Sequence, residues 1–118
     1  MKIAEAARRL SALSQESRLE VFRLLVKAGP KGIAAGDIAR RLETAANTMS
    51  AQLLVLSNAG LVRARREGRS IIYSADFEAM SGLLLYLTED CCGGKPEICA
   101  PLVKTVTSCC PSPRRAAR

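Results

Sequence analysis

The chain contains no histidine and no tryptophan, and its only aromatic residues are two phenylalanines and two tyrosines. Without imidazole there is no histidine to serve as a general base and no mixed cysteine–histidine metal site. With so few aromatic rings, the hydrophobic core must consist mainly of leucine, isoleucine, valine and alanine, which favours packed helices. These absences argue against a thiol enzyme and predict a small, mainly helical protein.

Long apolar segments are also missing. The longest apolar run, Leu83 to Leu87, is far too short to span a membrane. Residues 1–13 are amphipathic and include Glu5 and Arg8, unlike the apolar stretch of a secretory signal peptide. We therefore expect a cytoplasmic protein with no membrane partner, whose thiols are reduced by default. At 118 residues, the chain has the length of one domain with a tail.

Acidic residues are outnumbered by basic ones. Asp and Glu total 11 against 18 Lys and Arg, which gives a net charge of +7. A basic balance of this size suits a nucleic-acid binder, because neutralising phosphates supplies much of the affinity. The alternative is a soluble basic protein with no such partner.

Cysteine is absent from the first 90 residues, and all five cysteines lie in the last 28. An odd number argues against a pure disulfide framework. A thiol cluster without imidazole is typical of a detector for something thiophilic. The cluster comprises Cys91, Cys92, Cys99, Cys109 and Cys110.

Apolar spacing and breaker residues predict the order of the elements. A first helix covers about 3–13, a second runs from a Ser14 cap to Gly29-Pro30, and two more cover 36–42 and 46–58. Two short strands, 61–66 and 70–74, flank a turn at Gly68, which predicts a β-hairpin. Asp76 is expected to cap a last helix that ends near residue 89. The predicted fold is mainly α with a small hairpin, in a domain of 1–90 followed by a Cys-rich segment and basic tail of 91–118.

The third and fourth predicted helices have the arrangement of a helix-turn-helix, with the fourth as the reading helix. Opposite its apolar positions lie three small or amide side chains with two flanking residues, which suit base edges and phosphates. The alternative is an ordinary solvated helix face. The residues predicted to contact DNA on this helix are Asn47, Thr48, Ser50, Ala51 and Gln52.

The predicted hairpin concentrates positive charge. Arg63, Arg65, Arg66 and Arg69 are opposed locally only by Glu67. Arginines near the tip of a hairpin suit phosphates or a narrow minor groove, and we assign Arg65, Arg66 and Arg69 to DNA. The alternative is an edge strand that charge protects from aggregation. The helix-turn-helix and the adjacent arginine hairpin together are more specific than either alone.

Residues 11–76 resemble the winged helix-turn-helix domain of the ArsR/SmtB family of bacterial metalloregulatory repressors. The stretches that carry the resemblance are LSQESRLEVFRLLVKAGPKGIAAGDIARRL, NTMSAQLLVLSNAGLVRARREGRSIIYSAD and the following FEAMSGLLLYLTEDCCGG. The most specific run is L-x-x-L-x-x-A-G-L-V-x-x-R-R-E-G-R-x-I-x-Y. The resemblance implies a homodimer, joined mainly through the first and last helices, on double-stranded operator DNA with an inverted repeat.

Two departures from the family pattern matter. Many relatives carry a cysteine pair in the third helix, where this chain has Ile33-Ala34-Ala35-Gly36-Asp37, so that inducer site is absent. Many relatives have histidine where Gln52 stands, so the base preference is expected to differ. Gln52 still offers both a donor and an acceptor.

The segment Cys91-Cys92-x6-Cys99 resembles the C-terminal arsenite site of one branch of the arsenical-resistance repressors. As(III) and Sb(III) are soft centres that prefer three thiolates in a pyramid. Gly93-Gly94 permits the sharp path that brings Cys99 back to the vicinal pair. Cys109 and Cys110 are possible additional ligands, although doubling the loop costs about 0.6 kcal/mol and favours the local set.

These features predict a metalloid-responsive transcriptional repressor that binds operator DNA as a dimer. We expect As(III) or Sb(III), bound as an inducer by the C-terminal cysteines, to release it. No permanent cofactor and no enzymatic activity are expected. Two alternatives use the same fold: a thiol redox-sensing repressor and a zinc-responsive repressor.

Overall fold

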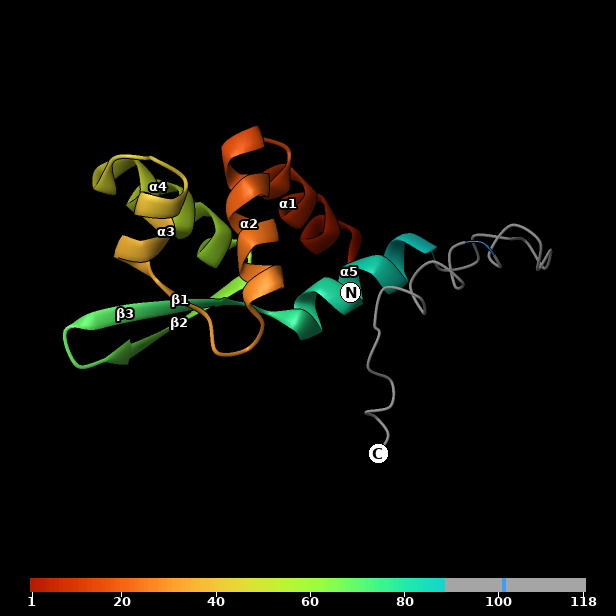
Figure 1. Ribbon diagram of the computed structural model, residues 1–118. Helices are drawn as coiled ribbons and strands as arrows, with labels where there is room; N and C mark the ends of the chain where they lie inside the picture. Colours follow the sequence, from red (N-terminus) through yellow and green to blue (C-terminus); the bar gives the residue numbers. More distant parts are fainter. Residues whose placement is uncertain (89–100, 102–118) are drawn as a thin grey trace, which may run out of the picture. The chain divides into compact units, whose positions relative to one another are not determined.

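The structure, a computed structural model, describes residues 1–88 and 101 of the chain. In order, the elements are α1 (Ile3–Leu13), α2 (Glu16–Ala28), β1 (Ile33–Ala34), α3 (Ala35–Arg41), α4 (Ala46–Asn58), β2 (Val62–Glu67), β3 (Ser70–Ala75) and α5 (Phe77–Thr88). Five helices and a small sheet confirm the prediction of a mainly α fold with a hairpin (Figure 1). The predicted boundary between residues 90 and 91 lies outside the described residues.

The helix boundaries follow the breaker residues closely. Helix α4 has the predicted bounds, and α3 begins one residue earlier than expected. The prediction of Ser14 as the cap of α2 is wrong. Gln15 is the N-cap, and its side chain accepts a hydrogen bond from the backbone N–H of Arg18. Ser14 instead ends α1, where its hydroxyl donates to the carbonyl oxygen of Ser11.

The sheet has one strand more than the sequence indicated. Its order is β1-β3-β2, and both pairings are antiparallel. Strand β1 has only two residues, too few to show an alternating pattern, and it pairs Ile33 with Tyr73. Strands β2 and β3 form the predicted hairpin, with Val62 opposite Ala75 and Glu67 opposite Ser70.

The core lies between the helices and one face of the sheet. Helices α2, α3 and α4 contact the strands from that side (Figure 1). The predicted core residues Met49, Leu53 and Leu56 are at most 3% exposed, which fixes the orientation of α4. The other fully buried large side chains are Val21, Leu25, Ile38 and Leu61.

The first and last helices leave apolar side chains at the surface of the single chain. In α1 the buried positions are Ala6 and Ala12, whereas Ile3 is 74% exposed. In α5 the buried positions are Ala79 and Leu83, and Leu87 is half exposed. Leu13, Phe77 and Met80 pack against the core, so only part of the apolar surface of these two helices is covered within one protomer. Among the described residues, no helix combines the length and the apolar character needed to cross a membrane.

Candidate nucleic-acid interface

A tight connection sets the position of α4 relative to α3. The N–H of Thr44 donates to the carbonyl oxygen of Ala39 at 2.9 Å, and the N–H of Glu43 donates to that of Arg40 at 3.2 Å. This pair of bonds is a Schellman motif, in which Glu43 takes the left-handed conformation (φ 50°) usually given to glycine. The turn ends α3 at Arg41, and α4 begins at Ala46.

The outer face of α4 is exposed and carries no charge. Asn47, Thr48, Ser50 and Ala51 are all exposed, and no residue of 46–58 is acidic or basic. The N-cap, Ala45, supplies no side-chain hydrogen bond, so the first backbone N–H groups of α4 are left for an external acceptor. A helix N-terminus of this kind attracts an anion such as a phosphate.

Gln52 differs from the four other residues predicted on this helix. It is half-buried, and its Oε1 accepts a hydrogen bond from Nη1 of Arg18 at 3.3 Å. Arg18 is itself held by a 2.6 Å bond from its Nε to the carbonyl oxygen of Ala12. The sequence carries no signal for this contact, because the residues that it joins are 34 positions apart.

The hairpin turn is made by Gly68 and Arg69 between the paired residues Glu67 and Ser70. Gly68 has a positive φ of 63°, whereas Arg69 does not, which is the pattern of a type II′ turn. The prediction that glycine supplies the positive φ is confirmed. All residues from 63 to 71 are exposed, so the hairpin projects from the domain as a wing.

The strand register sorts the arginines onto the two faces of the hairpin. Arg66 pairs with Ile71 and lies on the face that carries the buried Val62, against which α4 packs. Arg63 and Arg65 lie on the opposite face. Arg69 is at the turn itself. The wing therefore presents Arg66 on the helix-covered face and Arg69 at its tip.

Hydrogen bonds separate the same arginines into two kinds. Nε of Arg65 donates to Oε2 of Glu67 at 2.8 Å, and its Nη2 donates to the carbonyl oxygen of Lys31 at 2.7 Å. Arg63 pairs with Asp76 at 3.1 Å. Within residues 1–88, the side chains of Arg66 and Arg69 make no hydrogen bond or ion pair. Two arginines therefore brace the wing, and two remain available for phosphates.

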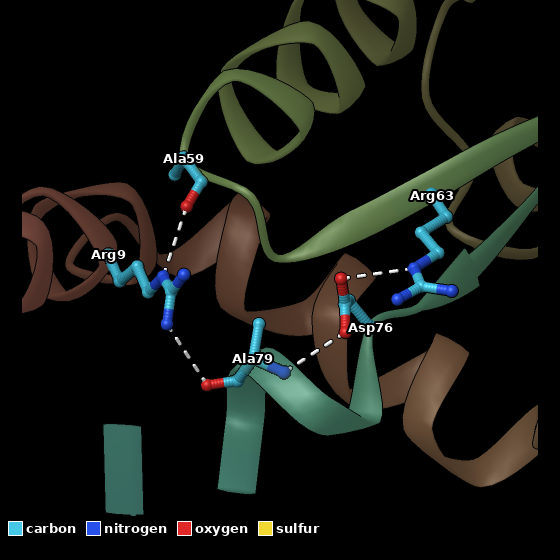
Figure 2. Close-up of polar contacts among 5 residues, drawn as sticks. All are labelled: Arg9, Ala59, Arg63, Asp76 and Ala79. Carbon is cyan, nitrogen blue, oxygen red and sulfur yellow. Dashed lines mark hydrogen bonds and ion pairs between the residues drawn. The ribbon is translucent and has the colours of Figure 1, made fainter. Parts of the chain in front are cut away.

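Asp76 joins the wing to the start of α5. Its Oδ1 accepts from the N–H of Ala79 at 3.0 Å, which confirms it as the helix cap, and its Oδ2 accepts from Arg63 (Figure 2). Burial acts to raise the pKa of this carboxyl, but the hydrogen bonds from Ala79 and Arg63 outweigh that effect. The pKa of Asp76 therefore lies below its usual value, and the side chain is ionised at neutral pH.

Arg9 links three helices through one half-buried guanidinium. Its Nε donates to the carbonyl oxygen of Ala59, the C-cap of α4, at 3.3 Å. Its Nη1 donates to the carbonyl oxygen of Ala79 in the first turn of α5, also at 3.3 Å (Figure 2). Sequence reasoning missed this residue, because an arginine on an amphipathic helix usually faces solvent.

The five predicted thiol ligands, Cys91, Cys92, Cys99, Cys109 and Cys110, all lie outside the described residues. Within the part of the chain that the structure describes, no group of three or more potential ligands is placed to hold a metal ion. The thiol site therefore stays a prediction from the sequence.

A protein-family model described as a helix-turn-helix domain matches residues 13–65, which contain α2, α3 and α4. The HTH-type transcriptional regulator YgaV of Escherichia coli (strain K12) is 30% identical over 88 residues, which cover 75% of this chain and 87% of that protein.

Two further similarities concern a metal-resistance regulator and a solved structure. The cadmium resistance transcriptional regulatory protein CadC homolog of Staphylococcus aureus is 30% identical over 80 residues, or 68% of this chain and 64% of that protein. The solution structure of the homodimeric winged helix-turn-helix DNA-binding domain of Mb0332 from Mycobacterium bovis, a possible ArsR-family regulator, is 31% identical. It has a TM-score of 0.62 and covers 73% of this chain and 78% of that domain.

Proposed function

Because the chain belongs to the ArsR/SmtB family of winged-helix transcriptional regulators, whose members bind DNA and are not enzymes, we propose that it is a metalloid-responsive repressor. It binds operator DNA as a homodimer and leaves the operator when As(III) or Sb(III) binds to C-terminal thiols. The observation that carries the proposal is a set of hydrogen bonds that join the reading helix α4 and the wing to the first turn of α5. Helix α5 is the one that precedes the cysteines in the chain.

The neutral face of α4 enters the major groove in this proposal. Asn47, Thr48, Ser50 and Ala51 are short enough to let the helix approach the base edges closely. The free N–H groups at its start bind a phosphate oxygen. Because α4 has no charge of its own, most phosphate neutralisation must come from elsewhere, and Arg66 and Arg69 on the wing provide it.

A homodimer accounts for the apolar surface of α1 and α5. Ile3 is 74% exposed, Leu10 42% and Leu87 50%, and apolar side chains of this size on two helices favour burial against a second copy. The related Mb0332 domain is homodimeric. Two copies related by a two-fold axis would present two reading helices to an inverted repeat.

Three thiolates match the proposed inducers. Cys91 and Cys92 follow α5 within a few residues, and Cys99 is the nearest third thiol. Soft thiolates select soft centres, and without histidine the chain cannot build the mixed sites that favour zinc. Cys109 and Cys110 remain further possible ligands. The related CadC homolog carries cadmium resistance in its name, which supports a response to thiophilic ions in this family.

Release follows from the connections of α5. Inducer binding just beyond α5 shifts this helix, and the shift reaches the end of α4 through Arg9 and the wing through Asp76. Operator half-sites have a fixed spacing, so a small tilt of the two reading helices weakens both contacts. Coupling free energies of this kind are typically about 1–3 kcal/mol, or roughly 5- to 150-fold in affinity.

Fluorescence anisotropy on labelled promoter DNA tests the proposal. Arsenite and antimonite are titrated into complexes of the fully reduced wild type and of each Cys→Ser variant. We expect release by either metalloid from the wild type and no release from Cys99→Ser, which leaves only a vicinal pair. Release by oxidant alone would favour the redox-sensing alternative, and release by Zn²⁺ alone would favour the zinc-responsive one.

A further inference from the structure

The side-chain amide of Gln52 is held in one orientation by Arg18. Arginine is only a donor, so the group of Gln52 that faces it must be the carbonyl oxygen. The bond from Nη1 of Arg18 to Oε1 of Gln52 measures 3.3 Å. The amide nitrogen of Gln52 therefore points away from Arg18.

Arg18 is fixed firmly enough to impose this orientation. Its Nε donates to the carbonyl oxygen of Ala12, in the last turn of α1, at 2.6 Å. Its backbone N–H is bound by the side chain of Gln15 at 3.1 Å. Both the backbone and the side chain of Arg18 are thus anchored before it reaches Gln52, and rotating away would leave the carbonyl of Ala12 without this donor.

The amide nitrogen of Gln52 has no acceptor of its own. Within residues 1–88, no group accepts a hydrogen bond from it. Gln52 lies one helical turn after the exposed Thr48 and next to the exposed Ala51, along the edge of the reading face. A half-buried donor without a partner, on a helix that reads DNA, is placed to donate to a ligand.

We propose that Arg18 is a positioning residue for base recognition, which makes Gln52 a donor-only reader of the major groove. Bidentate recognition of adenine by glutamine needs the amide oxygen and nitrogen together at the base edge, whereas the contact with Arg18 turns the oxygen toward that guanidinium. Guanine presents two acceptors, O6 and N7, to the remaining NH₂ group, whereas cytosine presents only a donor. Gln52 therefore selects guanine and rejects cytosine, and it does not show the usual adenine preference of glutamine.

The inference needs only the DNA-binding function of the family and is independent of the inducer. It is tested by selecting bound sequences from a random duplex pool with the wild type and three variants. Gln52→Met keeps the length but has no hydrogen-bonding amide, so the operator position that loses its preference identifies the base read by Gln52. At that position the wild type is expected to enrich guanine over adenine and cytosine.

The two other variants change the donor pattern in opposite ways. Arg18→Met frees the amide oxygen, and adenine should gain at least about fivefold over guanine at the same position. Gln52→Glu keeps an acceptor for Arg18 but removes the donor, so cytosine should replace guanine there. This second variant keeps the test decisive even if Arg18→Met fails to fold, which thermal unfolding of each protein would reveal.

Three results would overturn the inference. One is a wild-type preference for adenine at the identified position. Another is an unchanged consensus for Gln52→Met, which would mean that Gln52 reads no base. The third is a folded Arg18→Met protein that binds all sequences more weakly by the same factor, since a purely structural Arg18 lowers affinity without altering base preference.

Discussion

The guanidinium of Arg9 donates to the carbonyl oxygen of Ala59, and the bond lies where the reading helix α4 ends. The same guanidinium also binds the carbonyl of Ala79 in the first turn of α5. One side chain from α1 therefore joins the proposed reading helix to the helix that precedes the cysteines in the chain.

We expect Arg9→Met to uncouple the two sites. Both hydrogen bonds disappear while the methylene stem is kept, so operator binding should persist but arsenite should change the operator Kd by less than about threefold, against roughly 5- to 150-fold for the wild type. Anisotropy titrations with and without arsenite measure the ratio. The matched control is Arg8→Met, because the Arg8 side chain is exposed and makes no hydrogen bond or ion pair within residues 1–88. Full coupling in Arg9→Met would show that the signal takes another route.

The wing arginines should separate into two classes in mutagenesis. Arg66→Ala and Arg69→Ala are each expected to weaken operator binding and to reduce the slope of log K against log salt by about one, because each loses one phosphate contact. Their free energies of unfolding should stay within about 0.5 kcal/mol of the wild type.

Arg65→Ala provides the comparison for the wing. It loses the bond to the carbonyl oxygen of Lys31 and should lower the free energy of unfolding by about 1 kcal/mol. Denaturant titrations of the three variants measure this difference. Equal destabilisation by all three substitutions would contradict the division into braces and phosphate-binding groups.

Glycine is required at position 32 for two reasons, the backbone conformation and the lack of space for a side chain. It has a φ of 74°, and a Cβ at this position would overlap the carbonyl oxygen of Tyr73 in the central strand. We expect Gly32→Ala to lower the free energy of unfolding by more than about 2 kcal/mol. Gly60 is the matched control, because its φ of 79° is similar but a Cβ would make only ordinary contacts with Arg9. Gly60→Ala should cost about 1 kcal/mol, and equal losses would contradict the steric argument.

Because of Asp76, the free energy of unfolding should depend on pH. Its pKa is lower in the folded protein than in the unfolded chain, so its contribution is fully present above the unfolded value near 3.8 and is lost as the pH falls through the folded pKa. Asp76→Asn keeps a capping oxygen but removes this acid-dependent loss. Asp76→Ala also removes the cap and should cost about 1–2 kcal/mol at neutral pH. Urea unfolding from pH 7 to pH 3 separates the two, and an unchanged acid dependence in Asp76→Asn would contradict the role given to the carboxylate.

The sequence predicted those elements that local residues determine. Helix α4 has apolar residues at helical spacing and glycine at its end, so its bounds were confirmed at both ends. The turn at Gly68 was equally local. Strand β1 was missed, because two residues form a strand only through pairing with β3, which is distant in the sequence.

Other features were beyond sequence reasoning because they depend on which residues meet in space. Ser14 and Gln15 are both polar and adjacent, and only the backbone path selects Gln15 as the cap. The hydrogen bonds of Arg65 with Lys31 and of Gln52 with Arg18 each cross 34 positions. The sequence identified which residue types the site contains. It did not identify which arginine side chains are engaged in hydrogen bonds and ion pairs within the protein.

In the proposed mechanism, a metalloid and the operator weaken each other's binding to the same protein. Arsenite affinity should therefore be measured for the fully reduced protein alone and for the protein saturated with operator DNA. Linkage requires that DNA lower the arsenite affinity by the factor by which arsenite lowers DNA affinity, roughly 5- to 150-fold. Equal arsenite affinity in the two titrations, or no arsenite binding in either, would contradict the account.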